Sequence, residues 1–404
     1  MRKKEKILLA FSGGLDTTFC AVYLARERNY EVHTAIVNTG GFSPEELDRI
    51  EKHAGKLGVA SHHVLDVTGD YYQRCIRFML FGNALRNRSY PLSVSSERSF
   101  QAIATAEYAL KNGFKKIAHG STAAGNDQVR FDLTLAVLAP GIEVITPIRE
   151  LKISREMEID YLENKGISVN TGEVEYSVNK GLWGTSIGGK ETLTSDRELP
   201  DSAFPSGKPK RDSTLLEISF EKGEPVAVNG KIMDPLEAIL TLEEIGSAYA
   251  IGRDVHVGDT IIGIKGRVGF EAPAARLLID AHLALEKHVL TRWQLHWKEQ
   301  IGSWYGMFVH EAQFLEPVMR NLEDFLESSQ QNVTGTVTLR LRPYHHQVTG
   351  VSSDYDLMDA EFAAYGEENR GWSAKDVDGF TRLLGNQQKI WFMKNPEARE
   401  KSFK

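Results

Sequence analysis

Cysteine is scarce in this 404-residue sequence, which contains only Cys20 and Cys75. Two thiols in a chain of this length argue against a disulfide framework and favour reduced, packed side chains in a cytoplasmic protein. Long apolar runs are also missing, so no segment has the length of a membrane span. Positive charge is not in excess, because 48 Lys and Arg oppose 55 Asp and Glu and give a net charge of −7. The sequence therefore predicts no nucleic-acid or membrane partner.

The N-terminal part of the sequence alternates between apolar runs and helix-like patterns. A serine-proline-glutamate-glutamate sequence at 43–46 predicts the capped start of one helix, and 99–111 predicts another. The expected strands are residues 7–11, 30–37, 63–67, 116–119 and 142–146. Such alternation predicts an α/β domain with a parallel sheet between helices. In these sheets ligands bind at the carboxyl ends of the strands.

The composition changes in the second half of the chain. Residues 171–213 are rich in Gly, Ser, Thr and Lys and predict a long connecting loop. Beyond it, 215–228 favours a pair of strands, 274–327 favours helices, and 336–341 alternates as a strand. An α+β second domain is expected here, followed by a helical tail from residue 373.

The first expected strand ends in a glycine turn, Ser12-Gly13-Gly14. Glycine lets a phosphate approach the backbone, and the following helix N-terminus adds positive potential. Asp16 beside a phosphate is a normal means of holding Mg²⁺. The turn matches neither a GxxxxGK[ST] nor a GxGxxG pattern. The plain alternative is a turn that only joins a strand to a helix.

A second turn of this kind follows another expected strand. The stretch HGSTAAGNDQVRF contains Gly120 and Gly125 and then places Asn126, Asp127 and Arg130 close together. Arginine clamps a carboxylate with two hydrogen bonds, and an aspartate beside an asparagine can hold an ammonium group. Two glycine turns on one sheet can face each other across a crevice. A binding site is the better interpretation than a merely capped helix.

These stretches together resemble a known family. SGGLD after the first strand resembles the PP-loop of the ATP pyrophosphatases, and with HGSTAAGNDQVRF the match narrows to the argininosuccinate synthase family. SYPLSVSSERS is similar to the family's citrulline-binding stretch. YSVNKGLWGTSIGGKE and IGIKGRVGFEAPAA resemble two later, looser motifs. The resemblance covers most of the chain in order.

The resemblance implies a ligase that consumes ATP. In this family the ureido oxygen of citrulline attacks the α-phosphate, and aspartate then displaces AMP from the citrullyl-adenylate, so that argininosuccinate, AMP and pyrophosphate form in arginine biosynthesis. The implied domains are a PP-loop nucleotide-binding domain over 1–168, a synthetase and multimerisation domain over 169–370, and a C-terminal helical tail over 371–404. A cytoplasmic homotetramer that uses ATP and Mg²⁺ is implied as well.

The family's functional residues carry over by position. The residues that match the ATP site are Ala10, Phe11, Ser12, Gly13, Gly14, Leu15, Asp16, Thr17, Thr18, Val37 and Gly120. Ser12, Asp16 and Thr17 are the implied catalytic positions, with Asp16 near Mg²⁺. The residues that match the aspartate site are Thr122, Asn126 and Asp127, and those that match the citrulline site are Tyr90, Ser95, Asn126, Arg130, Ser177 and Ser186.

The sequence departs from the family pattern at several positions. Ala124 replaces a lysine, and Ser93 and Val94 replace a glycine and a threonine. Gly258 and Phe270 stand where the family places a glutamate and a tyrosine that recognise the ammonium end of citrulline.

Two explanations of the last departure are open. In the first, another acid, such as Glu173, Glu175 or Glu191, binds the ammonium group of citrulline. In the second, the substrate is an N-acylated citrulline, which has no ammonium group. Plain citrulline is the favoured substrate. A different PP-loop adenylating enzyme and a nucleotide-binding relative without activity are the rival interpretations of the whole chain.

Overall fold

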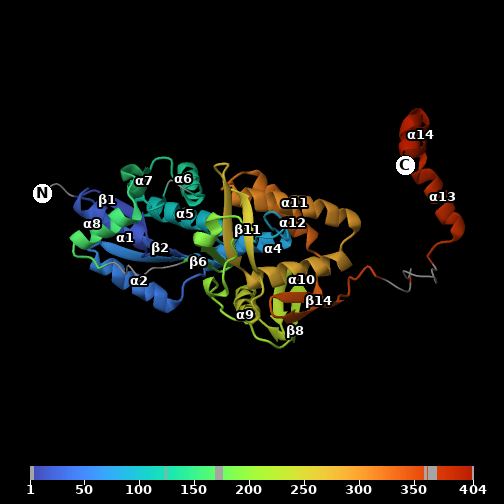
Figure 1. Cartoon of the computed structure of the whole chain (residues 1–404), viewed down its shortest axis with the longest axis horizontal. Helices are drawn as coiled ribbons and strands as arrows, with labels where there is room; N and C mark the ends of the chain where they lie inside the picture. Colours follow the sequence, from blue (N-terminus) through green and yellow to red (C-terminus); the bar gives the residue numbers. More distant parts are fainter. Residues whose placement is uncertain (1–3, 123–124, 169–175, 359–361, 363–370, 403–404) are drawn as a thin grey trace. The chain divides into compact units, whose positions relative to one another are not determined.

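The computed structural model describes residues 4–122, 125–168, 176–358, 362 and 371–402. Contacts divide the chain into one unit that ends at Tyr355 and a second unit from Asp356 onward. The first unit contains three sheets, and Figure 1 shows how helices surround them.

The N-terminal sheet is parallel, with strand order β3-β2-β1-β4-β5. Its strands are β1 (Lys6–Ala10), β2 (Glu31–Asn38), β3 (Ser61–Asp66), β4 (Lys116–Ala118) and β5 (Glu143–Ile145). Ile7, Leu8 and Leu9 in the central strand are fully buried, because helices cover both faces of a parallel sheet. The predicted α/β fold is confirmed.

Six helices pack around this sheet. They are α1 (Leu15–Arg26), α2 (Pro44–Lys56), α5 (Ser93–Lys111), α6 (Asp127–Leu138), α7 (Pro147–Leu151) and α8 (Arg155–Asn164). The predicted capping box at α2 is present, since Ser43 Oγ accepts from Glu46 N at 3.2 Å and Glu46 Oε2 accepts from Ser43 N at 2.8 Å.

Helix α5 begins six residues before the expected start at 99. Its first turns contain buried serines, and Ser96 Oγ donates to Leu92 O over 3.0 Å. Small polar residues that bond to the backbone interrupt the spacing of apolar residues, every three to four positions, from which a helix is predicted. The segment before it, where the sequence around Cys75 is helix-like, forms three short helical pieces: α3 (Thr68–Tyr71), η1 (Tyr72–Ile76) and α4 (Arg77–Phe81).

The rest of the first unit contains two antiparallel sheets. One has the order β10-β9-β8-β13-β14, and the other has the order β11-β12-β7-β6. Their strands are β6 (Ser177–Gly181), β7 (Gly184–Gly188), β8 (Thr214–Glu221), β9 (Glu224–Val228), β10 (Lys231–Ile232), β11 (Arg253–Asp259), β12 (Lys265–Glu271), β13 (Gly335–Arg342) and β14 (His345–Ser352).

The prediction of one loop over 171–213 was wrong for its described part. Residues 177–188 form the β6–β7 hairpin, and two short 3₁₀ turns follow, η2 (Lys190–Leu193) and η3 (Asp201–Ala203). The strands are glycine-rich, so their sequence lacks the alternation that identifies a strand.

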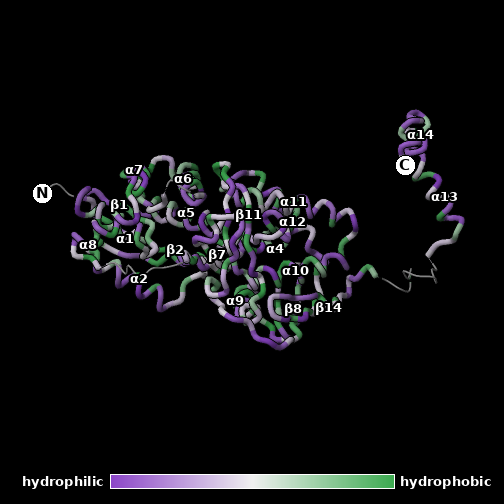
Figure 2. The backbone as a smooth tube through the Cα atoms, viewed as in Figure 1, coloured by the Kyte–Doolittle hydropathy of each residue, from purple (hydrophilic) through white to green (hydrophobic). Residues whose placement is uncertain are grey.

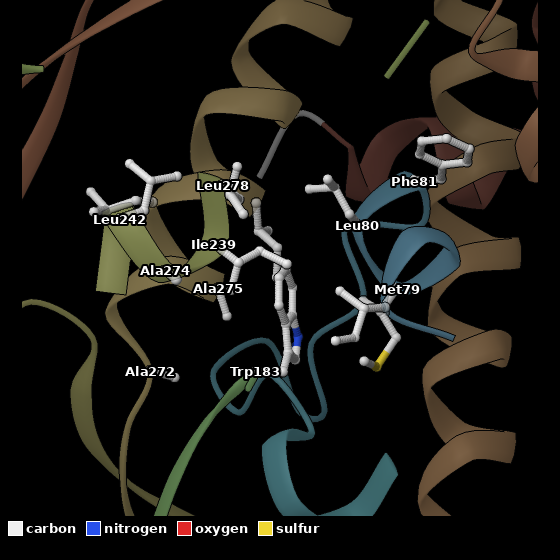
Figure 3. Close-up of a cluster of buried hydrophobic side chains, with 14 of the residues drawn as sticks. Met79, Leu80, Phe81, Trp183, Ile239, Leu242, Ala272, Ala274, Ala275 and Leu278 are labelled. Carbon is white, nitrogen blue, oxygen red and sulfur yellow. The ribbon is translucent and has the colours of Figure 1, made fainter. Parts of the chain in front are cut away.

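Trp183, in the turn of this hairpin, enters the main apolar core. Its side chain is fully buried and lies near Met79 and Ala275 (Figure 3). The helices of this part of the first unit are α9 (Pro235–Ser247), α10 (Pro273–Val289), α11 (Arg292–His310) and α12 (Val318–Ser329). The hairpin is therefore fixed at its turn by burial of a large side chain.

The second unit contains helices α13 (Ala374–Leu384), α14 (Asn386–Lys394) and α15 (Pro396–Lys401). None of the described residues in these helices is buried, although α13 and α14 include apolar stretches (Figure 2). Among all described helices, none is long and apolar enough to cross a bilayer.

Candidate active site

A cleft of about 880 Å³ opens at the carboxyl ends of β1, β2 and β4. Its other walls come from α5, α6, the β6–β7 hairpin and the β11–β12 pair. Both glycine turns border this cleft, as the sequence predicts for a parallel sheet.

The first glycine turn forms an open phosphate-sized cradle before α1. Gly13 has φ +77°, a conformation that side chains with a β-carbon rarely adopt. Gly14 N donates to Ser12 Oγ at 3.4 Å, and Thr17 Oγ1 donates to Gly14 O at 3.2 Å. These bonds order the turn, and the N-terminus of α1, which favours an anion, borders the cleft.

The structure brings most of the predicted ATP residues together on the cleft. Those that line it are Ala10, Phe11, Ser12, Gly14, Leu15, Asp16, Thr17, Val37 and Gly120. Gly13 and Thr18 are not among the lining residues. Thr18 is buried, and its Oγ1 lies 2.8 Å from His53 Nε2, away from the cleft.

Asp16 lines the cleft, and Glu158 of α8 contacts it from the buried side. Burial, together with the charge of Asp16 and a hydrogen bond to it, raises the pKa of Glu158 to about 8. The described residues contain no cluster of three or more potential metal ligands. A half-buried carboxylate that faces the cleft beside the glycine turn fits Mg²⁺ that takes its other ligands from phosphate and water.

The second glycine turn places a charged group on α6 at the centre of the cleft. Asp127 Oδ1 accepts from Arg130 Nη1 at 2.9 Å, and Asp127 Oδ2 accepts from Arg98 Nε at 3.0 Å. Burial opposes ionisation, but the two guanidinium groups lower the pKa of Asp127. The carboxylate is therefore charged at neutral pH and holds both arginines in place.

The second half of the chain supports this group. Ile261 N donates to Asn126 Oδ1 over 2.8 Å, and Arg130 Nη2 donates to His310 O over 3.1 Å. Arg98 Nη2 also donates to Asn179 Oδ1, in β6, at 3.3 Å. Residues predicted to bind aspartate and citrulline are thus positioned from several elements at once.

All predicted residues of the two acceptor substrates lie on the same cleft. They are Tyr90, Ser95, Thr122, Asn126, Asp127, Arg130, Ser177 and Ser186. Residues 184–188 (GTSIG) match the G-x-S-x-G pattern of a nucleophile elbow, but they form strand β7 and not a strand-to-helix turn.

The end of the cleft near Gly258 contains nitrogen donors. A β-carbon on Gly258 would lie 2.5 Å from His256 Nε2 and 3.3 Å from Asn87 Nδ2, so the imidazole occupies the space of a larger side chain. Tyr90 stacks on His256 with ring centroids 5.2 Å apart, and it contacts Phe270 at 5.3 Å. Buried Nδ1 of His256 has no hydrogen-bond partner.

The acids expected to replace the missing glutamate differ in location. Glu191 is not a lining residue of the cleft, while Glu173 and Glu175, like Ala124, fall outside the described residues. Sequence reasoning missed Glu97 and Arg98, which do line it. Their position within SYPLSVSSERS was the available signal.

A parallel sheet with an open glycine turn before α1, facing a substrate cleft, defines a nucleotide-binding enzyme of the PP-loop, or HUP, class. Comparisons with known proteins give the family. The model of the argininosuccinate synthase N-terminal HUP domain matches residues 6–168, and that of the argininosuccinate synthase C-terminal domain matches residues 176–391. The chain belongs to the argininosuccinate synthase family.

Relatives similar to this chain come from distant organisms. The argininosuccinate synthase of Methanocaldococcus jannaschii is 35% identical over 96% of this chain and 98% of its own length. Those of Dictyoglomus thermophilum and Xanthomonas campestris pv. campestris are each 36% identical over 97% of this chain, and over 98% and 99% of their own lengths. The match therefore includes both halves of the cleft.

Proposed function

We propose that this chain joins citrulline and aspartate to form argininosuccinate, with ATP cleaved to AMP and pyrophosphate. The observation that carries the proposal is that both glycine turns line one cleft, the first with Ser12 and Gly14 and the second with the Asn126–Asp127–Arg130 group. The family membership of both halves supports it further. The reaction belongs to arginine biosynthesis.

In the proposed mechanism, the first turn binds the leaving pyrophosphate. Amides at Gly13 and Gly14, the Ser12 and Thr17 hydroxyls and the N-terminus of α1 stabilise negative charge there. Val37 and Gly120 lie along the nucleotide. The ureido oxygen of citrulline then attacks the α-phosphate, because the chain holds the two groups in line.

Asp127 and Asn126 hold the ammonium group of aspartate, and Thr122 lies beside them on the cleft wall. Arg130 binds the carboxylate of citrulline through its guanidinium. Tyr90, Ser95, Ser177 and Ser186 line the remaining length of this substrate. The amine of aspartate then attacks the ureido carbon and releases AMP, so positioning supplies most of the catalysis.

We propose that Asp16 holds Mg²⁺, which would supply charge neutralisation between the phosphates when bound. Calorimetric titration of ATP tests this assignment without turnover. In the wild-type protein Mg²⁺ tightens ATP binding, and in Asp16→Ala that gain is lost. An equal Mg²⁺ effect in both proteins contradicts the role of Asp16.

The central experiment measures pyrophosphate release with each substrate omitted in turn. The proposal expects pyrophosphate release to depend on citrulline. It expects formation of net product to depend on aspartate as well. Release without citrulline would favour a different PP-loop adenylating enzyme. ATP binding with no release under any combination would favour a nucleotide-binding relative without activity.

An N-acylated citrulline is the second candidate substrate. The observation that favours it is that His256 Nε2 and Asn87 Nδ2 occupy the space beside Gly258, where the family places a glutamate. Steady-state kinetics with citrulline, N-acetylcitrulline and N-succinylcitrulline compare the two. Plain citrulline is expected to be preferred, and a kcat/KM at least tenfold higher for an acylated form, about 1.4 kcal/mol, would reverse this assignment.

A cytoplasmic homo-oligomer, with four copies as in the family resemblance, completes the proposal. Buried, unpaired Cys20 and Cys75 support a reducing compartment. Two apolar faces support self-association: Trp293, Trp297 and Trp304 on α11 are 63, 57 and 54% exposed, and the tail helices expose further apolar side chains.

A further inference from the structure

The turn of the β6–β7 hairpin is packed against the start of α5. Gly181 pairs with Gly184, and Leu182 and Trp183 form the two-residue turn between them. Trp183 anchors one side of this turn in the core (Figure 3). On the other side, the turn meets the side chain of Glu97, on α5.

Glu97 connects three segments that surround the cleft. Its Oε1 accepts from Leu182 N at 3.1 Å, and it also accepts a hydrogen bond from Thr39, directly after β2. Only 2% of Glu97 is exposed, and it lines the cleft. Close packing continues beside it, since a β-carbon on Gly41 would lie 2.6 Å from Lys180 O.

We propose that Glu97 is a positioning residue that fixes the β6–β7 hairpin against α5 and thereby sets the spacing between Ser95 and the hairpin serines Ser177 and Ser186. The proposal rests on the proposed function, which assigns these serines to citrulline. Neighbouring Arg98 reinforces the attachment through its hydrogen bond to Asn179. Glu97 itself need not touch the substrate for this role.

Gly181 is the matching half of the attachment. A β-carbon at this position would overlap the Glu97 carboxyl group. The φ angle of Gly181 lies outside the left-handed region, so its backbone would accept alanine without strain. Space for Glu97, and not chain conformation, therefore requires glycine here.

The attachment depends on the protonation state of Glu97. Burial raises its pKa to about 8; Arg98 and the bonds from Leu182 and Thr39 act in the opposite direction, and Asp127 adds to the rise. The other ionisable group facing it is Tyr71, on α3. The carboxyl is mostly neutral at pH 7, and as the pH rises through 8 it gains a charge that burial disfavours.

The test uses two single variants and their combination, Glu97→Ala, Gly181→Ala and the double variant. Each single variant raises the KM for citrulline by about tenfold, the loss of one buried hydrogen bond, while the KM for ATP changes less than twofold. The double variant is no worse than Glu97→Ala, because removal of the carboxyl leaves room for the new methyl group. Glu107→Gln, exposed on the same helix, is the matched control.

The variant Glu97→Gln separates the effect of the hydrogen bond to Leu182 N from the effect of the carboxyl charge. Glutamine keeps the acceptor for Leu182 N, so the KM for citrulline stays near the wild-type value at pH 7. Between pH 5 and 8 the wild-type KM rises and then levels off, because a detached Glu97 ionises near its ordinary pKa while the attached, buried one ionises only near 8. The KM of Glu97→Gln does not rise in this range, apart from any change shared with Glu107→Gln. Equal pH profiles, or additive losses in the double variant, overturn the proposal.

Backbone amide hydrogen exchange, measured without substrates, tests the positioning role of Glu97 separately from the proposed function. Glu97→Ala increases exchange in residues 177–188, and Glu107→Gln does not. If this change occurs but the protein shows no citrulline-dependent pyrophosphate release, the attachment is correct and the substrate assignment fails. Unchanged exchange in Glu97→Ala overturns the positioning role whatever the substrate.

Discussion

Arg130 and Asp127 form an ion pair, with Nη1 2.9 Å from Oδ1, and Arg98 Nε occupies the other carboxylate oxygen at 3.0 Å. One carboxylate therefore orders two guanidinium groups and still faces the cleft. Under the proposed function, its charge would hold the ammonium group of aspartate, and its contact with Arg130 would orient the group that binds the citrulline carboxylate. The two acceptor sites are coupled through this residue.

Asp127→Ala is expected to impair both acceptor substrates. The kcat/KM for aspartate falls by about a hundredfold or more, because the amine loses its carboxylate and two guanidinium groups, of which that of Arg130 is buried, lose their partner. The kcat/KM for citrulline falls as well, by a smaller factor. Steady-state pyrophosphate release with each substrate varied measures both, and exposed Asp160→Ala is the control. A threefold or smaller loss for aspartate would contradict the assignment.

Gly13→Ala and Gly58→Ala form a matched pair for the phosphate cradle. Gly13 and Gly58 have φ angles of +77° and +76°, so alanine costs each site a similar strain of about 1 kcal/mol. ATP–pyrophosphate exchange with citrulline is abolished only in Gly13→Ala. Both variants lose stability in urea, and Gly13→Ala loses somewhat more because its new methyl group lies 3.2 Å from Ile50 Cγ1 while that of Gly58→Ala meets no atom within 4 Å. Equal exchange rates in the two variants would remove the cradle from the mechanism.

The buried pair of Glu286 and Lys298 predicts strong coupling in stability. Lys298 Nζ lies 2.8 Å from Glu286 Oε2, and their side chains are 2% and 0% exposed. Lys298→Met alone leaves an unpaired buried carboxylate and is expected to lower the free energy of unfolding by about 3–5 kcal/mol. Lys298→Met with Glu286→Gln costs clearly less. Urea unfolding of the singles and the double measures the coupling, and strict additivity would refute it.

His282 predicts a loss of stability in mild acid. Burial lowers its pKa to about 4, against the ordinary value of 6.5. Between pH 6.5 and 4 the unfolded chain takes up a proton that the folded chain does not, so the free energy of unfolding decreases as the pH falls. In His282→Gln this part of the pH dependence disappears. Urea unfolding at pH 7, 5.5 and 4.5 compares the two proteins, and parallel profiles would count against the prediction.

Removal of the tail is expected to reduce the size of the assembly. Phe380, Leu383, Leu384 and Ile390 are 63, 71, 65 and 58% exposed, more apolar surface than free helices require. Light scattering of the chain ended before Ser373 measures its mass. Phe380→Asp with Leu384→Asp in the full-length chain is the milder test. Wild-type mass in both proteins would exclude a role of the tail in assembly.

Local signals in the sequence were sufficient for the nucleotide half of the molecule. The turn at Gly13 and the capping box at Ser43 depend on adjacent residues, so they were predicted from short windows. The attachment of Glu97 could not be predicted in this way, because it depends on a glycine far along the chain. The same holds for His256, whose ring fills space that only the pairing of β11 with β12 creates.

Some errors arose from residue type. Serines at the start of α5 and glycines in β6 and β7 carry no apolar period, so the helix start and the hairpin were both missed. Those segments owe their structure to tertiary contacts, such as burial of Trp183. The substrate side of the cleft is built mainly of such segments.

The bonds from Ile261 N to Asn126 and from Arg130 to His310 O limit how such a chain can be divided. A fragment that ended at residue 168 would retain the strand and turn that cradle phosphate, but its second turn would lose these anchors. Recombination between distant PP-loop enzymes meets the same obstacle, because a foreign C-terminal half must place one backbone N–H opposite Asn126 and one backbone carbonyl opposite Arg130. Exchange of nucleotide domains between such enzymes therefore requires the α6 turn and its distant partners to be inherited together.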